Sequence, residues 1–67
     1  MNIILNNRKE EVNADEMSIQ ELILFKNYTF KLLVTKINGT LVKKIDRDKA
    51  TIKEGDKVDI IHLISGG

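Results

Sequence analysis

The protein has 67 residues and a formal net charge of +1, from 11 Lys plus Arg against 10 Asp plus Glu. A chain of about 60 residues buries only ~60% of its unfolded surface, so one small domain is predicted and a deep catalytic pocket is not. The sequence has no Cys, which excludes disulfides and thiol catalysis, and a single histidine excludes a multi-histidine metal site. We therefore expect a binding or carrier module without a metal site.

Charge and hydropathy argue against a nucleic-acid partner, a membrane span and a signal peptide. Nucleic-acid modules draw on a marked basic excess, which this chain lacks. There is no apolar run of about 18 residues, the length that a membrane span needs. The N-terminus has no basic stretch followed by an apolar one, the pattern of a signal peptide. We expect a cytoplasmic protein with no nucleic-acid or membrane partner.

The first third of the chain predicts a hairpin followed by a helix. Residues 2–6 are β-prone, Asn6-Asn7 offers turn chemistry, and a polar second strand is expected at residues 10–13. Ser18 and Glu21 then form the pattern of a capping box, which marks a helix start. Lys26 is expected in the last turn, and Asn27 is a plausible left-handed stop. The residues expected on the apolar face of the helix are Ile19, Leu22, Ile23 and Phe25.

The remaining residues alternate between β-prone runs and turns. A strand at residues 32–37 is followed by Asn38-Gly39, a strong two-residue hairpin signal, and by a return strand at residues 40–42. Residues 43–50 are polar and expected to be irregular. After a short strand at residues 51–52 and a turn at residues 54–56, residues 57–65 form the longest β-prone run.

This order of elements predicts an α+β fold of the β-grasp, ubiquitin-like type. It would be a mixed sheet of four to five strands with one main helix packed on one face. The first and last strands would be parallel neighbours in the centre, which suits their apolar composition. We expect residues 1–64 to form the β-grasp domain and residues 65–67 a flexible C-terminal tail.

Strand alternation assigns side chains to the two faces of that sheet. The residues predicted to face the helix are Ile3, Leu5, Val58, Ile60 and Ile64, with His62 in the same phase. The open face would carry Ile4, Ile61 and Leu63, which we interpret as an apolar patch for docking partner proteins. The alternative is a set of scattered surface aliphatics, which are ordinary.

Several other residues are interpreted as structural. Tyr28 and Phe30 are expected to cover the bottom of the core, and Gly55 and Asp56 to shape a turn. His62 has no Ser or Asp at a spacing that suggests a catalytic triad. A set of basic residues in the second half is interleaved with acids and is expected to form a solvated surface, a docking face for an acidic partner being the alternative. These are Lys43, Lys44, Arg47, Lys49, Lys53 and Lys57.

The C-terminal residues suggest a chemistry. Gly66 and Gly67 have no Cβ, so a tail made of them can enter a channel only as wide as the backbone. Residues 65–67 would extend up to about 10 Å beyond the sheet at ~3.3–3.6 Å per residue. A terminal carboxylate is ionised at neutral pH and can attack the α-phosphorus of a nucleotide held by another protein. The acyl-adenylate so formed is activated toward sulfur or nitrogen nucleophiles.

Three segments together resemble the ThiS family, the sulfur carriers of thiamine biosynthesis. They contain Ile-Asn-Gly at residues 37–39, Gly-Asp-x-Val at residues 55–58 and Gly-Gly at residues 66–67, and the opening Met-x-Ile-x-x-Asn fits as well. The resemblance covers essentially the whole chain. A departure lies after the Asn-Gly hairpin, where the family commonly has Pro followed by Arg and this chain has Lys43-Lys44.

The resemblance implies that Gly67 is adenylated by an ATP-dependent, ubiquitin-activating-like adenylyltransferase of the ThiF type. The adenylate would become a thiocarboxylate, from which a thiazole synthase of the ThiG type takes sulfur. Gly66 and Ser65 would form the tail that enters both partners, and Ile4, Ile61 and Leu63 would dock them. The chain would be no enzyme and would bind no cofactor, since the partner uses the ATP.

Three alternatives remain open. The small subunit of molybdopterin synthase shares this fold and tail chemistry, although such chains tend to be longer and often carry Pro before the terminal segment. Another ubiquitin-like sulfur carrier or protein modifier would fit equally. The alternative of a different class is a regulatory β-grasp binding domain with an inert tail.

Overall fold

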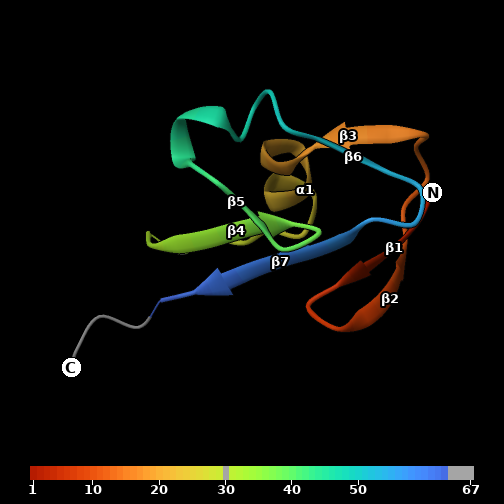
Figure 1. The fold of residues 1–67 in the computed structure, drawn as a ribbon, viewed down its shortest axis with the longest axis horizontal. Helices are drawn as coiled ribbons and strands as arrows, with labels where there is room; N and C mark the ends of the chain where they lie inside the picture. Colours follow the sequence, from red (N-terminus) through yellow and green to blue (C-terminus); the bar gives the residue numbers. More distant parts are fainter. Residues whose placement is uncertain (30, 64–67) are drawn as a thin grey trace.

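Two sheets and one helix make up the structure, a computed structural model that describes residues 1–29 and 31–63 (Figure 1). The predictions for Phe30, Ile64, Ser65, Gly66 and Gly67 lie outside the described residues. The elements in chain order are β1 (Asn2–Leu5), β2 (Arg8–Glu11), β3 (Glu16–Ser18), α1 (Ile19–Phe25), β4 (Leu33–Ile37), β5 (Thr40–Val42), the 3-10 helix η1 (Lys44–Asp46), β6 (Thr51–Lys53) and β7 (Lys57–His62).

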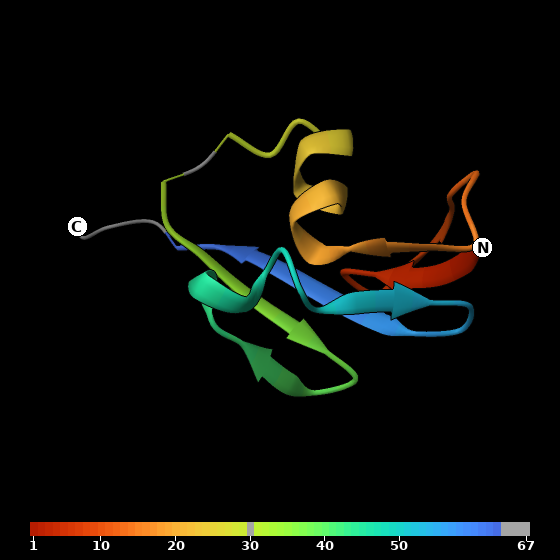
Figure 2. The same ribbon diagram turned by 90° about the horizontal axis from the view of Figure 1, so that it is seen from above.

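The larger sheet has the strand order β2-β1-β7-β4-β5, and β3 pairs with β6 in a small second sheet. The central pair β1 and β7 is parallel, with Leu5 opposite Val58, whereas β4 runs antiparallel to β7. Figure 2 shows α1 lying against one face of the larger sheet. The predicted α+β, β-grasp plan with parallel first and last strands in the centre is confirmed.

The helix begins at the predicted capping box. The Ser18 hydroxyl accepts a hydrogen bond from the Glu21 backbone N–H, and the Glu21 carboxylate accepts one from the Ser18 N–H, each at 3.0 Å. The prediction for Phe25 is wrong, because this side chain is 58% exposed. Phe25 lies about 120° around the helix axis from Ile19, which removes it from the buried face. The helix ends at Phe25, with Lys26 as C-cap and Asn27 at φ 57°.

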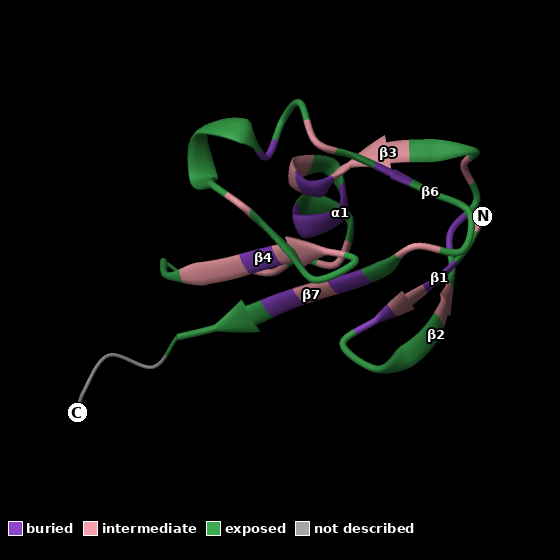
Figure 3. Ribbon diagram, viewed as in Figure 1, coloured by how far each residue is buried: buried purple, intermediate pink, exposed green. Residues whose placement is uncertain are grey.

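The core lies between the inner face of the larger sheet and a layer formed by α1, β3 and β6. Val58 and Ile60 on β7 are 0% and 5% exposed, which confirms the predicted alternation of this strand. Figure 3 shows the buried residues concentrated on the central strands and the helix. The buried apolar residues are Ile3, Leu5, Val12, Ile19, Leu22, Ile23, Ile52, Val58 and Ile60.

Residues at positive φ make the turns. Asn6 and Asn7 have φ values of 51° and 68°, and this tight turn starts β2 at Arg8, two residues earlier than expected. Asn38 at 50° and Gly39 at 83° form the predicted hairpin turn. Gly55 has φ 84°, as a turn glycine should, and Asp56 accepts hydrogen bonds from the side-chain amide of Asn38 and from the Lys53 N–H.

Two further features differ from the sequence prediction. The strand β3 was not expected, since a three-residue strand is too short to show alternation; its Met17 pairs with Ile52. Arg47, expected on a solvated surface, is buried. Its guanidinium donates hydrogen bonds to the Thr35 hydroxyl at 3.2 Å and to the Leu33 carbonyl at 2.6 Å. These two bonds hold the segment after η1 against β4.

Within the described part of the chain, no helix is both long and apolar enough to cross a membrane.

Candidate functional site

The candidate site is the C-terminal end of β7, from which the predicted tail continues. The pairing of β1 with β7 ends at Leu5 and Val58, and the chain of β1 then turns away at Asn6. On its other side, β7 continues to pair with β4 as far as His62, opposite Leu33. Among residues 1–29 and 31–63, β4 is therefore the only strand paired with the last part of β7.

Asn6 completes the hydrogen bonding of β7 where β1 stops. Its backbone N–H donates to the Val58 carbonyl at 2.9 Å, and its side-chain Oδ1 accepts from the Ile60 N–H at 2.8 Å. The backbone of Asn6 is in the left-handed region, where the strand β1 has ended. The side-chain oxygen therefore takes the place of a strand carbonyl in the contact with Ile60. The sequence identified Asn6 as a turn residue but gave no signal for this contact, which is 54 residues apart in sequence.

The last described backbone hydrogen bond of β7 joins the Leu63 N–H to the Leu32 carbonyl at 3.0 Å. The chain is thus held to the sheet up to Leu63, four residues before Gly67. The predicted tail residues Ser65, Gly66 and Gly67 follow and lie outside the described residues.

A group of apolar side chains lies on the open face beside this end of β7. Ile61 and Leu63 are each 47% exposed, and Leu32 is 51% exposed. Val34 on β4 is the cross-strand partner of Ile61 on β7, on the face opposite Thr35 and Ile60. Leu32, just before β4, and Leu63, just after β7, are joined by a backbone hydrogen bond and continue this pair. We call Leu32, Val34, Ile61 and Leu63 the apolar end of the open face.

Ile4 does not join this group, so the expected patch of three residues is wrong in that respect. Ile4 is in register with Lys57, four residues before Ile61 on β7. At ~3.3 Å per residue the two positions are about 13 Å apart along the sheet. On β2 the partner of Ile4 is Lys9. We call Lys9, Ile4 and Lys57 the basic end of the open face.

The face of β7 that points toward the helix carries His62, as the alternation predicted. Its side chain lines a hollow of about 210 Å³ together with Asn6, Tyr28, Leu33 and Ile60. Tyr28 is partly buried and packs against the core, which confirms its predicted role as a cover. His62 is exposed at the open side of this hollow.

The ion pair of the described residues lies on the helix side. The Lys26 ammonium donates to the Glu10 carboxylate at 3.0 Å, and this hydrogen bond raises the pKa of Lys26 above its usual value.

The described residues contain no group of three or more His, Cys, Asp or Glu side chains that could hold a metal ion. What the described residues provide at this end of β7 is an exposed apolar surface that ends at Leu63.

The family model described as the ThiS family matches residues 2–67. The chain belongs to the ThiS family. A crystal structure of the thiamine biosynthesis protein ThiS from Geobacter metallireducens is similar, with 26% identity, full coverage of both chains and a TM-score of 0.85. A solution structure of a thiamine biosynthesis protein from that organism has 24% identity and a TM-score of 0.77, and covers all of this chain and 88% of that one.

A curated sequence, the uncharacterized protein ycf40 of Trieres chinensis, is 25% identical over 61 residues, which are 91% of this chain and 84% of that protein. Membership of the ThiS family makes this chain a small ubiquitin-like sulfur carrier of the ThiS/MoaD type. Proteins of this family are generally not enzymes themselves, and generally interact with an activating enzyme and a synthase.

Proposed function

We propose that this ThiS-family protein carries sulfur as a thiocarboxylate on Gly67 and donates it for thiazole formation in thiamine biosynthesis. The observation that supports this most strongly is the extent of the family match, which runs from residue 2 to residue 67 and so includes the Gly-Gly tail. The similar crystal structure is that of a thiamine biosynthesis protein, which favours the thiazole pathway over others.

The chemistry begins at the Gly67 carboxylate. One of its oxygens attacks the α-phosphorus of ATP, and the bond to pyrophosphate breaks, which leaves an acyl-adenylate. Sulfide then attacks the carbonyl carbon and expels AMP, so that a C–S bond replaces the C–O bond to phosphate. Both steps take place in the active site of a ThiF-type adenylyltransferase, which binds the ATP. The carrier supplies the carboxylate and needs no general base or bound cofactor of its own.

Gly66 and Ser65 make this access possible. A tail without Cβ atoms at residues 66–67 fits a channel no wider than the backbone. The hydrogen bond from the Leu63 N–H to the Leu32 carbonyl holds the chain to the sheet up to Leu63, which supports a tail that begins beyond this residue. Since the same tail must later reach the sulfur acceptor, we assign it a second partner, a ThiG-type thiazole synthase.

The apolar end of the open face is the proposed docking surface for these partners. Ile61 and Leu63 come shortly before the proposed tail. Val34 on β4 and Leu32, just before β4, lie beside them. Exposed apolar groups of this kind at one end of a sheet favour a protein partner. Docking there would place the partner's active site within reach of a short extended tail.

Intact-mass measurement tests the proposal. After incubation with the host's own activating enzyme, ATP and sulfide, the mass should rise by one oxygen-to-sulfur exchange. Deleting Gly67 should abolish the change while the far-UV circular dichroism stays native, and Lys49→Ala, an exposed loop change, should leave it intact. Thiolation that persists without Gly67 would contradict the assignment, and an unmodified wild-type tail would favour the regulatory binding domain.

Sulfur transfer from the loaded carrier separates the two pathways. Thiazole synthase should consume the thiocarboxylate, whereas the large subunit of molybdopterin synthase should leave it unchanged. The opposite result would assign the chain to molybdopterin synthesis, and transfer to neither would point to another ubiquitin-like sulfur carrier or modifier.

A further inference from the structure

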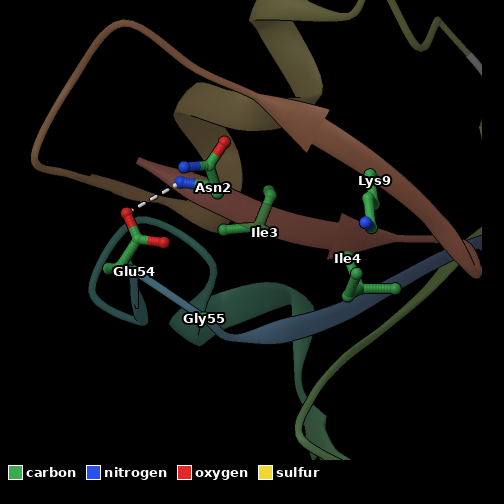
Figure 4. Close-up of a pocket in the computed structure, with 6 residues that line it drawn as sticks. All are labelled: Asn2, Ile3, Ile4, Lys9, Glu54 and Gly55. Carbon is green, nitrogen blue, oxygen red and sulfur yellow. Dashed lines mark hydrogen bonds between the residues drawn. The ribbon is translucent and has the colours of Figure 1, made fainter.

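The open face contains a second feature, at the opposite end of β7 from Leu63. An open hollow of about 460 Å³ lies where β1 meets the turn between β6 and β7, and is lined by Asn2, Ile3, Ile4, Lys9, Glu54 and Gly55. Figure 4 shows Ile4 and Lys9 together at one end of this hollow and Glu54 at the other. The lining is more apolar than polar, as in a site that receives a side chain.

The two ends of the hollow differ in charge. Lys9 and Lys57 are exposed on either side of Ile4, and within the described ranges neither forms an ion pair with a carboxylate. The Glu54 carboxylate instead accepts a hydrogen bond from the Asn2 backbone N–H at 2.9 Å (Figure 4). Other acids on this face are Asp59, opposite Lys36, and Glu11, opposite Asn2. Glu11 and Asp59 each lie two residues from one of these lysines on the same face. Since no ion pair holds Lys9 or Lys57 within the described ranges, both ammonium groups remain available to a partner beside an apolar floor.

We propose that the basic end of the open face is a second docking point for the activating enzyme, and that it receives an apolar side chain flanked by carboxylates. This inference rests on the proposed function, since it names a contact of the same complex. The apolar end has only four side chains, whereas a specific interface buries about 800 Å² per partner. A partner surface that also covers the basic end, about 13 Å away along the sheet, buries more area than the apolar end alone.

The position of the basic end indicates how it would contribute to docking of the activating enzyme. Both ends lie along β7, so one flat partner surface can contact them together while the tail is inserted beyond Leu63. Exposed charges at the edge of an interface act mainly on the association rate and on its salt dependence. The basic end therefore sets how fast and in which orientation the carrier arrives, and the apolar end and tail hold it.

Charge-reversal variants test this in an ATP–pyrophosphate exchange assay with the host's activating enzyme. We expect Lys9→Glu and Lys57→Glu each to raise the KM for the carrier about tenfold at low salt, with kcat unchanged. The matched control is Lys49→Glu, the same charge change on an exposed loop residue outside this face. Equal effects of all three variants would overturn the proposal, because they would report net charge alone.

For Glu54→Gln we expect a change of KM opposite to that of the lysine variants. The Gln side chain keeps an oxygen that can accept the hydrogen bond from the Asn2 N–H. Removing this negative charge should lower the KM, and a raised KM would overturn the assigned polarity. Circular dichroism should show each variant folded, and Ile4→Ala should raise the KM without a change of charge. A second copy of this chain is the other possible occupant of the basic end, and sedimentation of wild type and Lys9→Glu tests it. A dimer that is present in wild type and lost in the variant would assign the surface to that second copy and overturn the proposal.

Failure of this proposal differs from failure of the proposed function. Deleting Gly67 should remove pyrophosphate exchange altogether, whereas the lysine variants change only the KM. Exchange that is lost without Gly67 but unaffected by Lys9→Glu would overturn the basic end alone. If the wild type supports no exchange, calorimetric titration into the activating enzyme without ATP still compares Lys9→Glu with Lys49→Glu.

Discussion

The two halves of β7 have different surroundings. In the first half, Val58 is fully buried and Ile60 is 5% exposed, and the strand has β1 on one side and β4 on the other. In the second half, Ile61 and Leu63 are each 47% exposed and β4 is the paired strand. The first half joins the sheet to the core, whereas the second half extends past β1 with its apolar side chains in contact with solvent.

This difference assigns stability to the first half of the strand and the proposed partner binding to the second half. A buried apolar side chain on the first half contributes to folding, since its removal from water stabilises the native state. An equally apolar side chain on the second half contributes far less to folding and remains available to a partner. The same substitution placed one residue apart should therefore have opposite consequences.

The largest expected effect comes from placing a carboxylate at the two neighbouring positions. Ile60→Asp should unfold the protein, because an unpaired buried charge costs about 4 kcal/mol or more. A domain of this size rarely has more than about 3–5 kcal/mol of stability. Ile61→Asp should remain folded, with a loss of about 1–2 kcal/mol from strand propensity and partial burial, and should weaken binding to the activating enzyme. Urea unfolding followed by circular dichroism measures the first effect, and calorimetry the second.

Leu63→Asp serves as a second probe of the exposed half and should behave as Ile61→Asp does. If either variant unfolds while Ile60→Asp is tolerated, the two faces of β7 are inverted. If Ile61→Asp folds and binds as well as wild type, the apolar end is a solvent-exposed surface and not a docking site.

An intermediate effect is expected at Arg47, which supports the strand next to the exposed half of β7. Arg47→Met keeps the length of the side chain but removes the hydrogen bonds to Thr35 and Leu33 on β4. Hydrogen bonds from a charged group contribute about 1.5–3 kcal/mol each, so the loss of two costs about 3–6 kcal/mol. Because removing the buried charge also removes its desolvation cost, the variant should lose a net of about 2–4 kcal/mol of unfolding free energy. Lys44→Met, at an exposed position of η1, is the matched control and should be near neutral. Equal urea midpoints for the two variants would contradict this role.

Much of the fold was predictable because its signals are local. The capping box at Ser18, the Asn-Gly turn at Asn38 and the alternation of β7 each lie within a few residues, and the structure confirms them. The burial of Arg47 was not predictable, since an arginine among lysines and acids has the composition of a solvated surface. Only its contacts with Leu33, 14 residues away, and Thr35, 12 residues away, reveal the difference.

The candidate site was predictable in its parts but not in its arrangement. Alternation placed Ile61 and Leu63 on the open face, where both are exposed. Alternation does not predict the register between β1 and β7, because neither strand contains a signal for which residues pair between them. That register places Ile4 beside Lys57, and the pairing of β4 with β7 leaves Val34 and Leu32 as the apolar neighbours of Ile61 and Leu63.

The smallest expected effect tests what separates the two halves of β7, the Asn6 side chain. Asn6→Gly preserves the left-handed backbone but removes the Oδ1 that accepts from the Ile60 N–H. Asn7→Gly is the matched control, since Asn7 also has positive φ and the added glycine has the same effect on the unfolded chain. Asn6→Gly should be less stable than the control by about 1 kcal/mol, the contribution of one hydrogen bond. Hydrogen exchange at the Ile60 amide should quicken in Asn6→Gly only. Equal exchange in both variants would mean that β7 needs no side chain to replace β1, and that its two halves differ by burial alone.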